Sequence, residues 1–165
     1  MNKIDHLKLE MFLFDTGEPE LIQHLIKVYE FARLIGTMEH ISPDQQEILE
    51  AAALVHDIGI KVAMEKYGNC NGKLQEQEGP AYAEEILAKL GFKQEVIDRV
   101  SYLVAHHHTY TDIDGMDYRI LVEADFLVNL YENQSSREAI LSAYDKMFKT
   151  KAGRELCRRM FQIEA

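Results

Sequence analysis

Four stretches with helical periodicity each place one titratable side chain on a face that is otherwise apolar. The clearest case is Asp125, which lies four residues after Leu121 and three before Val128. A buried carboxylate without a partner costs several kcal/mol, so this position needs a compensating group. The other three faces carry a histidine in register with their apolar residues, and these are His24, His56 and His107.

Any one of these side chains alone is typical of a hydrogen-bonded core residue. Four of them, directed inward from four helices of a small chain, are neutralised most simply by one divalent metal in the middle of the bundle. Imidazoles and carboxylates without a thiolate suit Mn, Fe, Co, Ni or Zn better than calcium or magnesium. The sequence therefore predicts a divalent transition metal without selecting one.

The elements that must position these side chains are all predicted to be helices, because apolar residues recur at helical spacing and no strand-like alternation stands out. The second helix begins with a clear signal, in which Ser42 can cap, Pro43 takes the first position and Gln45 completes a capping box. Residues 66–79 are polar and rich in glycine and asparagine, which favours a loop able to act as a lid. The expected architecture is an all-α bundle of six or seven helices, over 19–35, 42–57, 80–90, 93–107, 118–132 and from 136 onward.

Length and composition are those of one globular domain over residues 1–165, with a motif-bearing core at about 20–130 and C-terminal helices at 136–165. The net charge of −10 argues against binding to nucleic acid or to an anionic membrane. Cys70 and Cys157 have no metal-type spacing, which indicates free thiols in a reducing compartment. The N-terminal residues fit neither a signal peptide nor an anchor, so we expect a cytoplasmic protein.

Two other segments are candidate surfaces for contact with a partner molecule. The basic run "KTKAGRELCRR" near the C-terminus is interpreted as a solvated helix face. The apolar "MFLF" at 11–14 can pack on its own domain or on a second chain, so a homo-oligomer is compatible with the sequence.

The order His24, then "HD" at 56–57, then Asp125 within a helical chain resembles the H…HD…D signature of the HD-domain superfamily of metal-dependent phosphohydrolases. An HD dipeptide alone is a weak signal, but the chain order and the inward-facing positions make the whole pattern fairly specific. The match spans about residues 20–130. The resemblance implies an all-α fold and a metal held by His24, His56, Asp57 and Asp125.

Many relatives in this superfamily hold a second metal, with one ligand from an "HH" pair at a helix end. Here the pair lies within "AHHHT", where helix phase favours His107 and leaves His106 and His108 open. The other histidine of the family pattern is absent. The aligned stretch "QEQEGPAYA" offers instead Gln75, Glu76 and Glu78. Either a glutamate replaces the missing histidine, or the protein binds one metal and His107 acts on the substrate directly.

For a phosphohydrolase, the chemistry is attack of an activated water on a small phosphate ester or nucleotide. Asp57 is then a candidate to orient or deprotonate that water, and a nearby lysine is needed for the phosphate. The catalytic residues expected are Asp57, His107 and Lys61, and the substrate contacts expected are His108, Lys73 and Glu78.

Two alternatives remain open at this point. Some members of the superfamily hold two irons and use oxygen to cleave a carbon bond, which requires a complete second metal site. The other alternative is a non-catalytic, metal-stabilised helical module that binds a nucleotide or a protein.

Overall fold

The computed structural model describes residues 1–164, which form nine α-helices and no β-strand. The all-helical class is therefore as predicted. The helix number is higher than expected, because α1 and α4 are not among the expected helices and extended backbone at Phe148 and Thr150 divides the C-terminal segment in two. The helices are α1 (Lys3–Phe14), α2 (Pro19–Met38), α3 (Pro43–Val55), α4 (Gly59–Tyr67), α5 (Gly72–Lys89), α6 (Gln94–Val104), α7 (Met116–Glu132), α8 (Arg137–Met147) and α9 (Lys151–Phe161).

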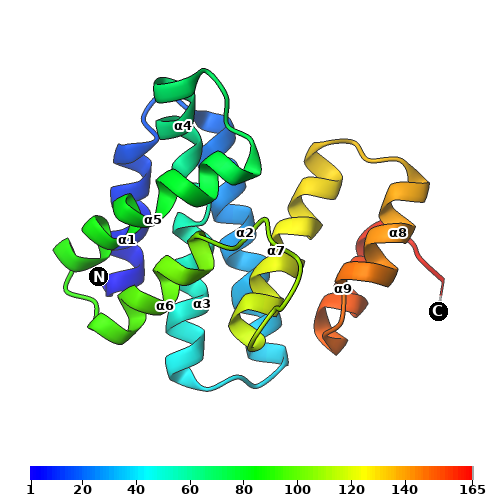
Figure 1. Cartoon of the computed structure of the whole chain (residues 1–165). Helices are drawn as coiled ribbons and strands as arrows, with labels where there is room; N and C mark the ends of the chain where they lie inside the picture. The colour runs from blue at the N-terminus through cyan, green and yellow to red at the C-terminus, as the bar shows by residue number, and fades with distance from the viewer. Residues whose placement is uncertain (165) are drawn as a thin grey trace.

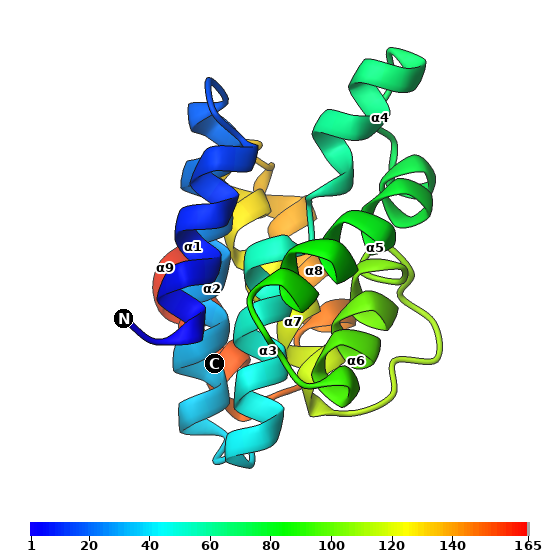
Figure 2. The ribbon, with the colours of Figure 1, turned by 90° about the vertical axis from the view of Figure 1, so that its left-hand side faces the viewer.

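Helix α3 is the central element of the bundle. It packs against α1, α2, α6 and α7, while α4 and α5 pair with each other beside it and α8 with α9 covers the side of α7 (Figure 1). The view turned by 90° shows α3 running between the α1–α2 pair and the α5–α6 pair (Figure 2). The end of α3, where the HD pair lies, is therefore surrounded by other helices.

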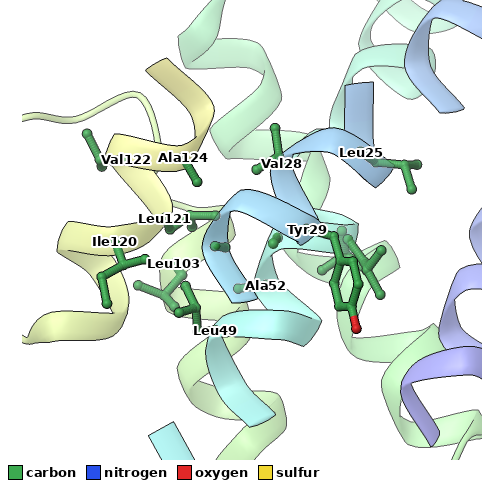
Figure 3. Close-up of a cluster of buried hydrophobic side chains, with 14 of the residues drawn as sticks. Leu25, Val28, Tyr29, Leu49, Ala52, Leu103, Ile120, Leu121, Val122 and Ala124 are labelled. Carbon is green, nitrogen blue, oxygen red and sulfur yellow. The ribbon is translucent and has the colours of Figure 1, made fainter. Parts of the chain in front are cut away.

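The core explains why α3 can occupy this position. Ala51, Ala52 and Ala53 are fully buried, and their small side chains let neighbouring helices approach closely. The packed side chains around Ala52 come from α2, α6 and α7 (Figure 3). The core thus fixes the helices that carry the titratable residues relative to one another.

The predicted start of α3 is confirmed. The Ser42 side chain accepts a hydrogen bond from the Gln45 backbone at 3.2 Å, and the Gln45 side chain accepts one from the Ser42 backbone at 3.4 Å. The helix ends at Val55, and His56 is its C-terminal cap residue.

The prediction of a loop over 66–79 is wrong, because α5 begins at Gly72 after the side chain of Asn71 accepts from the Leu74 backbone at 3.0 Å. Packing stabilises this helix despite Pro80 in its interior. A Cβ on Gly59 would lie 2.5 Å from the Gln75 carbonyl oxygen, so α4 and α5 meet at a distance that only glycine permits. What remains between α4 and α5 is a short connection, 68–71, and not a long lid.

The C-terminal helices are attached to α7 through Glu123, which is fully buried. Its carboxylate accepts hydrogen bonds from the backbone of Lys149 at 2.6 Å, the backbone of Thr150 at 2.9 Å and the Thr150 hydroxyl at 2.5 Å. Most of the basic run lies on α9, where Arg159 is exposed and the Arg154 guanidinium donates to the carbonyls of Tyr144 and Phe148. The run is therefore only partly a solvated face.

The apolar N-terminal stretch divides between inside and outside. Met11 is buried and Phe14 packs against the core, while Phe12 and Leu13 are exposed. Among residues 1–164, no helix has both the length and the apolar character that a membrane crossing needs.

Candidate metal centre

The inward-facing histidines and aspartates meet at one point between α2, the end of α3 and α7. One ligand atom from each of four side chains lies within 4.8 Å of the other three. His24 and Asp125 are 7% and 5% exposed, and His56 is fully buried. The four residues are His24, His56, Asp57 and Asp125, the set expected from the sequence.

The spacing of these atoms suits metal coordination. His24 Nε2 lies 3.1 Å from Asp57 Oδ2, 3.1 Å from Asp125 Oδ1 and 3.3 Å from His56 Nε2. His56 Nε2 lies 3.3 Å from Asp57 Oδ2 and 3.4 Å from Asp125 Oδ1. Ligands bonded at about 2.1 Å to one ion are separated by roughly 3.0 to 3.4 Å, depending on geometry. The group therefore has the dimensions of a coordination shell.

Hydrogen bonds outside the group fix how the imidazoles face. His56 Nδ1 donates to the Ala53 carbonyl at 2.7 Å, and His24 Nδ1 donates to Glu132 Oε1 at 2.5 Å. Both Nε2 atoms thus point at carboxylate oxygens, an arrangement that requires a positive charge between them. The donor set fits a divalent metal.

Two further side chains of α7 support the group, and the sequence analysis missed both. The Asn129 amide donates to Asp125 Oδ1 at 2.9 Å, and Glu132 bonds His24 with one oxygen and Lys27 with the other, the latter at 3.0 Å. Asn129 and Glu132 follow Asp125 by four and seven residues, so helical spacing alone could have identified them.

The pKa values of these side chains in the protein without an ion also indicate that the group favours a positive charge. Burial lowers the pKa of His24, but hydrogen bonds to Asp125 and Asp57 outweigh it and raise the pKa to about 10. Burial likewise opposes the charge on Asp57, and the neighbouring histidines nevertheless hold its pKa well below the ordinary range. Protons on the histidines therefore occupy the place that a metal would take.

A second group of ligand atoms adjoins the first and shares Asp57 with it. Asp57 Oδ1 lies 3.3 Å from His107 Nε2, while Asp57 Oδ2 faces His24 and His56. His107 is 2% exposed, its Nδ1 donates to the Val104 carbonyl at 2.8 Å, and its Nε2 has no hydrogen-bond partner. An orphaned buried nitrogen facing a carboxylate again fits a cation between the two.

His108 completes the second group, and its orientation is set by Gln75. The Gln75 amide nitrogen donates to the Cys70 carbonyl at 2.6 Å, so its oxygen accepts from His108 Nε2 at 2.8 Å. His108 Nδ1 is then the atom with a lone pair for the group. Burial and the nearby His107 lower the pKa of His108 to about 4, which keeps the imidazole neutral and able to bind metal.

The structure also shows which residues of "AHHHT" and "QEQEGP" lie at the ligand groups and which do not. His106 stacks on Tyr102 and donates to its carbonyl at 2.7 Å, and it belongs to neither ligand group. Glu76 accepts from the Thr109 hydroxyl at 2.8 Å. The residue beside His108 is thus Gln75, and the second group has three protein ligands.

Comparison with known proteins agrees with this geometry. The HD domain family model matches residues 21–147. The chain belongs to the HD-domain family. Its fold is similar to the crystal structure of a predicted HD superfamily hydrolase from an uncultured Thermotogales bacterium, with a TM-score of 0.68 and 24% identity over 96% of this chain and 83% of that one. A search of curated proteins found no match.

Three expected residues of this HD-domain protein lie away from both ligand groups. The Lys61 ammonium donates to the Phe14 carbonyl at 2.8 Å and so connects α4 to the end of α1. Lys73 is exposed in the first turn of α5. Glu78 pairs with Lys66 at 2.7 Å and accepts from the Tyr67 hydroxyl at 2.7 Å.

A cavity of about 620 Å³ opens beside the first ligand group, with His24 and Asp57 in its wall. Lys27, one turn after His24 on α2, also lines it, whereas Lys61 and Lys73, the two lysines that the sequence analysis selected, do not. A larger cavity of about 910 Å³, between the end of α2 and α9, contains none of the ligand residues.

Proposed function

We propose that the protein hydrolyses a phosphate ester of a small molecule, with the two ligand groups around Asp57 as its catalytic centre. The observation that carries the proposal is the division of the Asp57 carboxylate, whose two oxygens face different groups of histidines. Membership of a family of metal-dependent hydrolases supports the reaction type. A divalent metal bound there would lower the pKa of water from about 15.7 toward ~7 and polarise a phosphoryl oxygen.

The side chains of this chain would then act as follows. His24, His56, Asp57 and Asp125 would hold the first ion, and Asp57, His107 and His108 would hold a second. Asp57 is the carboxylate best placed to orient the attacking water or accept its proton, since it belongs to both groups. Glu132 and Asn129 restrict His24 and Asp125 to one orientation.

Substrate would enter through the cavity of about 620 Å³, a size typical of sites for small molecules. Lys27 lines this cavity with its side chain partly exposed, which makes it the lysine best placed to contact a phosphate. Lys61 and Lys73 are not needed for this role.

We favour hydrolysis over the oxidative alternative because the second group has fewer protein ligands than the first. Gln75 donates to Cys70 and accepts from His108, so its amide supports a ligand and does not act as one. Three ligands, one of them shared, leave positions open for water or a phosphoryl oxygen.

The test is phosphate release by protein reconstituted with Mn²⁺, Fe²⁺, Co²⁺, Ni²⁺ or Zn²⁺ from a panel of mononucleotides, cyclic nucleotides and sugar phosphates. We expect turnover that is lost on chelation and in Asp57→Asn, and retained in Asp44→Asn, which changes an exposed aspartate at the far end of α3. Metal content and helicity of each variant are measured in parallel. No release from any compound with any metal would overturn the proposal, and substrate-like ligands that bind equally well to Asp57→Asn would favour a binding module.

A further inference from the structure

The cavity beside the first ligand group has a charge pattern that limits which phosphate esters it can accept. It is formed by the start of α2, the junction of α3 with α4 and the end of α7. Apart from His24 and Asp57, its acidic and basic side chains are Glu20, Lys27 and Glu132. Among the described residues, Lys27 is the one lysine or arginine that lines it.

The charge of Lys27 is already balanced. Its ammonium lies 3.0 Å from Glu132 Oε2, and the other oxygen of Glu132 bonds His24. Glu20 then adds a negative charge to the lining, from the first turn of α2. A phosphoryl group beyond the one at the metals would therefore meet no uncompensated cation and would be repelled by Glu20.

The helix ends at the cavity do not change this balance in favour of anions. The start of α2 has one N–H fewer than an ordinary helix start, because Pro19 has none, and the Glu20 carboxylate in the first turn offsets the partial positive charge there. The end of α7, with Asn133 as its cap residue, presents carbonyl oxygens and their partial negative charge.

The remaining lining is polar but uncharged, with some apolar surface. Gln23 and Asn133 contribute exposed amides, and Tyr131 contributes a phenol on a side chain that is 70% exposed. Such groups hydrogen-bond hydroxyls and heterocyclic bases. Leu21 and Ile60 provide apolar contact for the body of a small molecule.

We propose that the substrate carries a single phosphoryl group on an uncharged, hydroxyl-bearing body, as in a sugar monophosphate or a nucleoside monophosphate. This inference rests on the proposed function. It assigns the phosphoryl group to the metal ligands and Lys27, and the neutral body to Gln23, Tyr131 and Asn133. Nucleoside diphosphates and triphosphates are disfavoured by charge and not by size.

The experiment compares the best monophosphate from the panel with the diphosphate and triphosphate of the same body, at a fixed concentration of free metal. We expect kcat/KM to fall at least about tenfold with each added phosphoryl group. A diphosphate or triphosphate that reacts as well as the monophosphate would overturn the inference and leave the proposed hydrolysis intact. Absence of phosphate release from every compound would overturn both.

A charge reversal provides the second measurement. Glu20→Lys should reduce the ratio of kcat/KM for the monophosphate to kcat/KM for the diphosphate by about tenfold, because it replaces a repulsive charge by an attractive one. Glu138→Lys is the matched control, since Glu138 is exposed at the same position in the first turn of α8 and does not line the cavity. If this ratio is unchanged in Glu20→Lys, or changes equally in Glu20→Lys and Glu138→Lys, the charge argument is overturned.

Discussion

His107 Nε2 lies 3.3 Å from Asp57 Oδ1 and forms no hydrogen bond. Because His107 Nδ1 donates to the Val104 carbonyl, Nε2 is the ring nitrogen left to bind a cation. A buried nitrogen and a carboxylate oxygen at this distance, with no hydrogen bond between them, fit a cation between the two. The pair is thus the best evidence in this chain for a second ion beside the first.

This relationship predicts the effect of removing His107. The His107→Gln variant should lower the metal content from two equivalents per chain to one and reduce turnover by about 100-fold or more. Metal content is measured by mass spectrometry after reconstitution, beside phosphate release.

The matched control for that variant is His106→Gln, because His106 is the adjacent histidine and belongs to neither ligand group. It should keep both equivalents. If the wild-type protein holds one equivalent and His107→Gln keeps it, the single-metal alternative holds and His107 acts on the substrate.

Glu132 supports a second prediction, because it holds the Nδ1 proton of His24 and fixes the direction of Nε2. Glu132→Ala should weaken metal binding by about 10- to 100-fold, and Glu132→Gln should weaken it less because the amide oxygen still accepts that proton. Titration with Mn²⁺, followed by the electron paramagnetic resonance signal of the free ion, measures this.

Glu138→Ala on α8 serves as the control and should bind Mn²⁺ like the wild type. The unfolding midpoints of the metal-free variants are compared as well, since a purely structural role of Glu132 would lower stability without changing Mn²⁺ affinity. Unchanged affinity in Glu132→Ala would contradict the positioning role.

Much of the centre could be predicted from the sequence because His24, His56 and Asp125 sit at helical spacing within apolar stripes, whereas Asp57 was expected from the resemblance to the HD signature. His24 and Asp125 are visible in this way without any knowledge of their partners. The same reasoning, carried seven residues along α7 from Asp125, would have found Glu132. Its residue type alone gives no such signal, because exposed glutamates are common near helix ends.

Other features depend on tertiary contacts that no local pattern contains. Lys61 follows the HD pair closely in sequence, but the chain turns between α3 and α4 and its ammonium meets the Phe14 carbonyl. Lys27 reaches the cavity because it lies one turn from His24. Helix α5 begins earlier than its composition suggests, because Gly59 allows α4 to contact it closely.

That contact predicts the result of Gly59→Ala. The new Cβ would lie 2.5 Å from the Gln75 carbonyl oxygen, a backbone atom that moves only if α5 moves. We expect a loss of about 1 to 3 kcal/mol in the free energy of unfolding and weaker binding of the second ion, since Gln75 orients His108. Urea unfolding and metal content measure the two effects, and Met64→Ala, at an exposed position of α4, is the control. A stable variant with full metal content would contradict the close packing of α4 on α5.

The raised pKa of His24 predicts how stability depends on pH when metal is removed. Although burial opposes its charge, hydrogen bonds to Asp125 and Asp57 raise its pKa from 6.5 to about 10, so the folded chain holds this proton more tightly than the unfolded chain. The stabilisation is complete below about pH 6.5 and is lost as pH rises through about 10. Urea midpoints of chelator-treated protein should therefore fall between about pH 6.5 and pH 9.5. The urea midpoint of metal-loaded protein should fall less over this range, because the ion replaces the proton. In metal-free His24→Gln, much of the dependence of the midpoint on pH should disappear. Stability that rises over this range in the metal-free protein would contradict the assignment of the proton to His24.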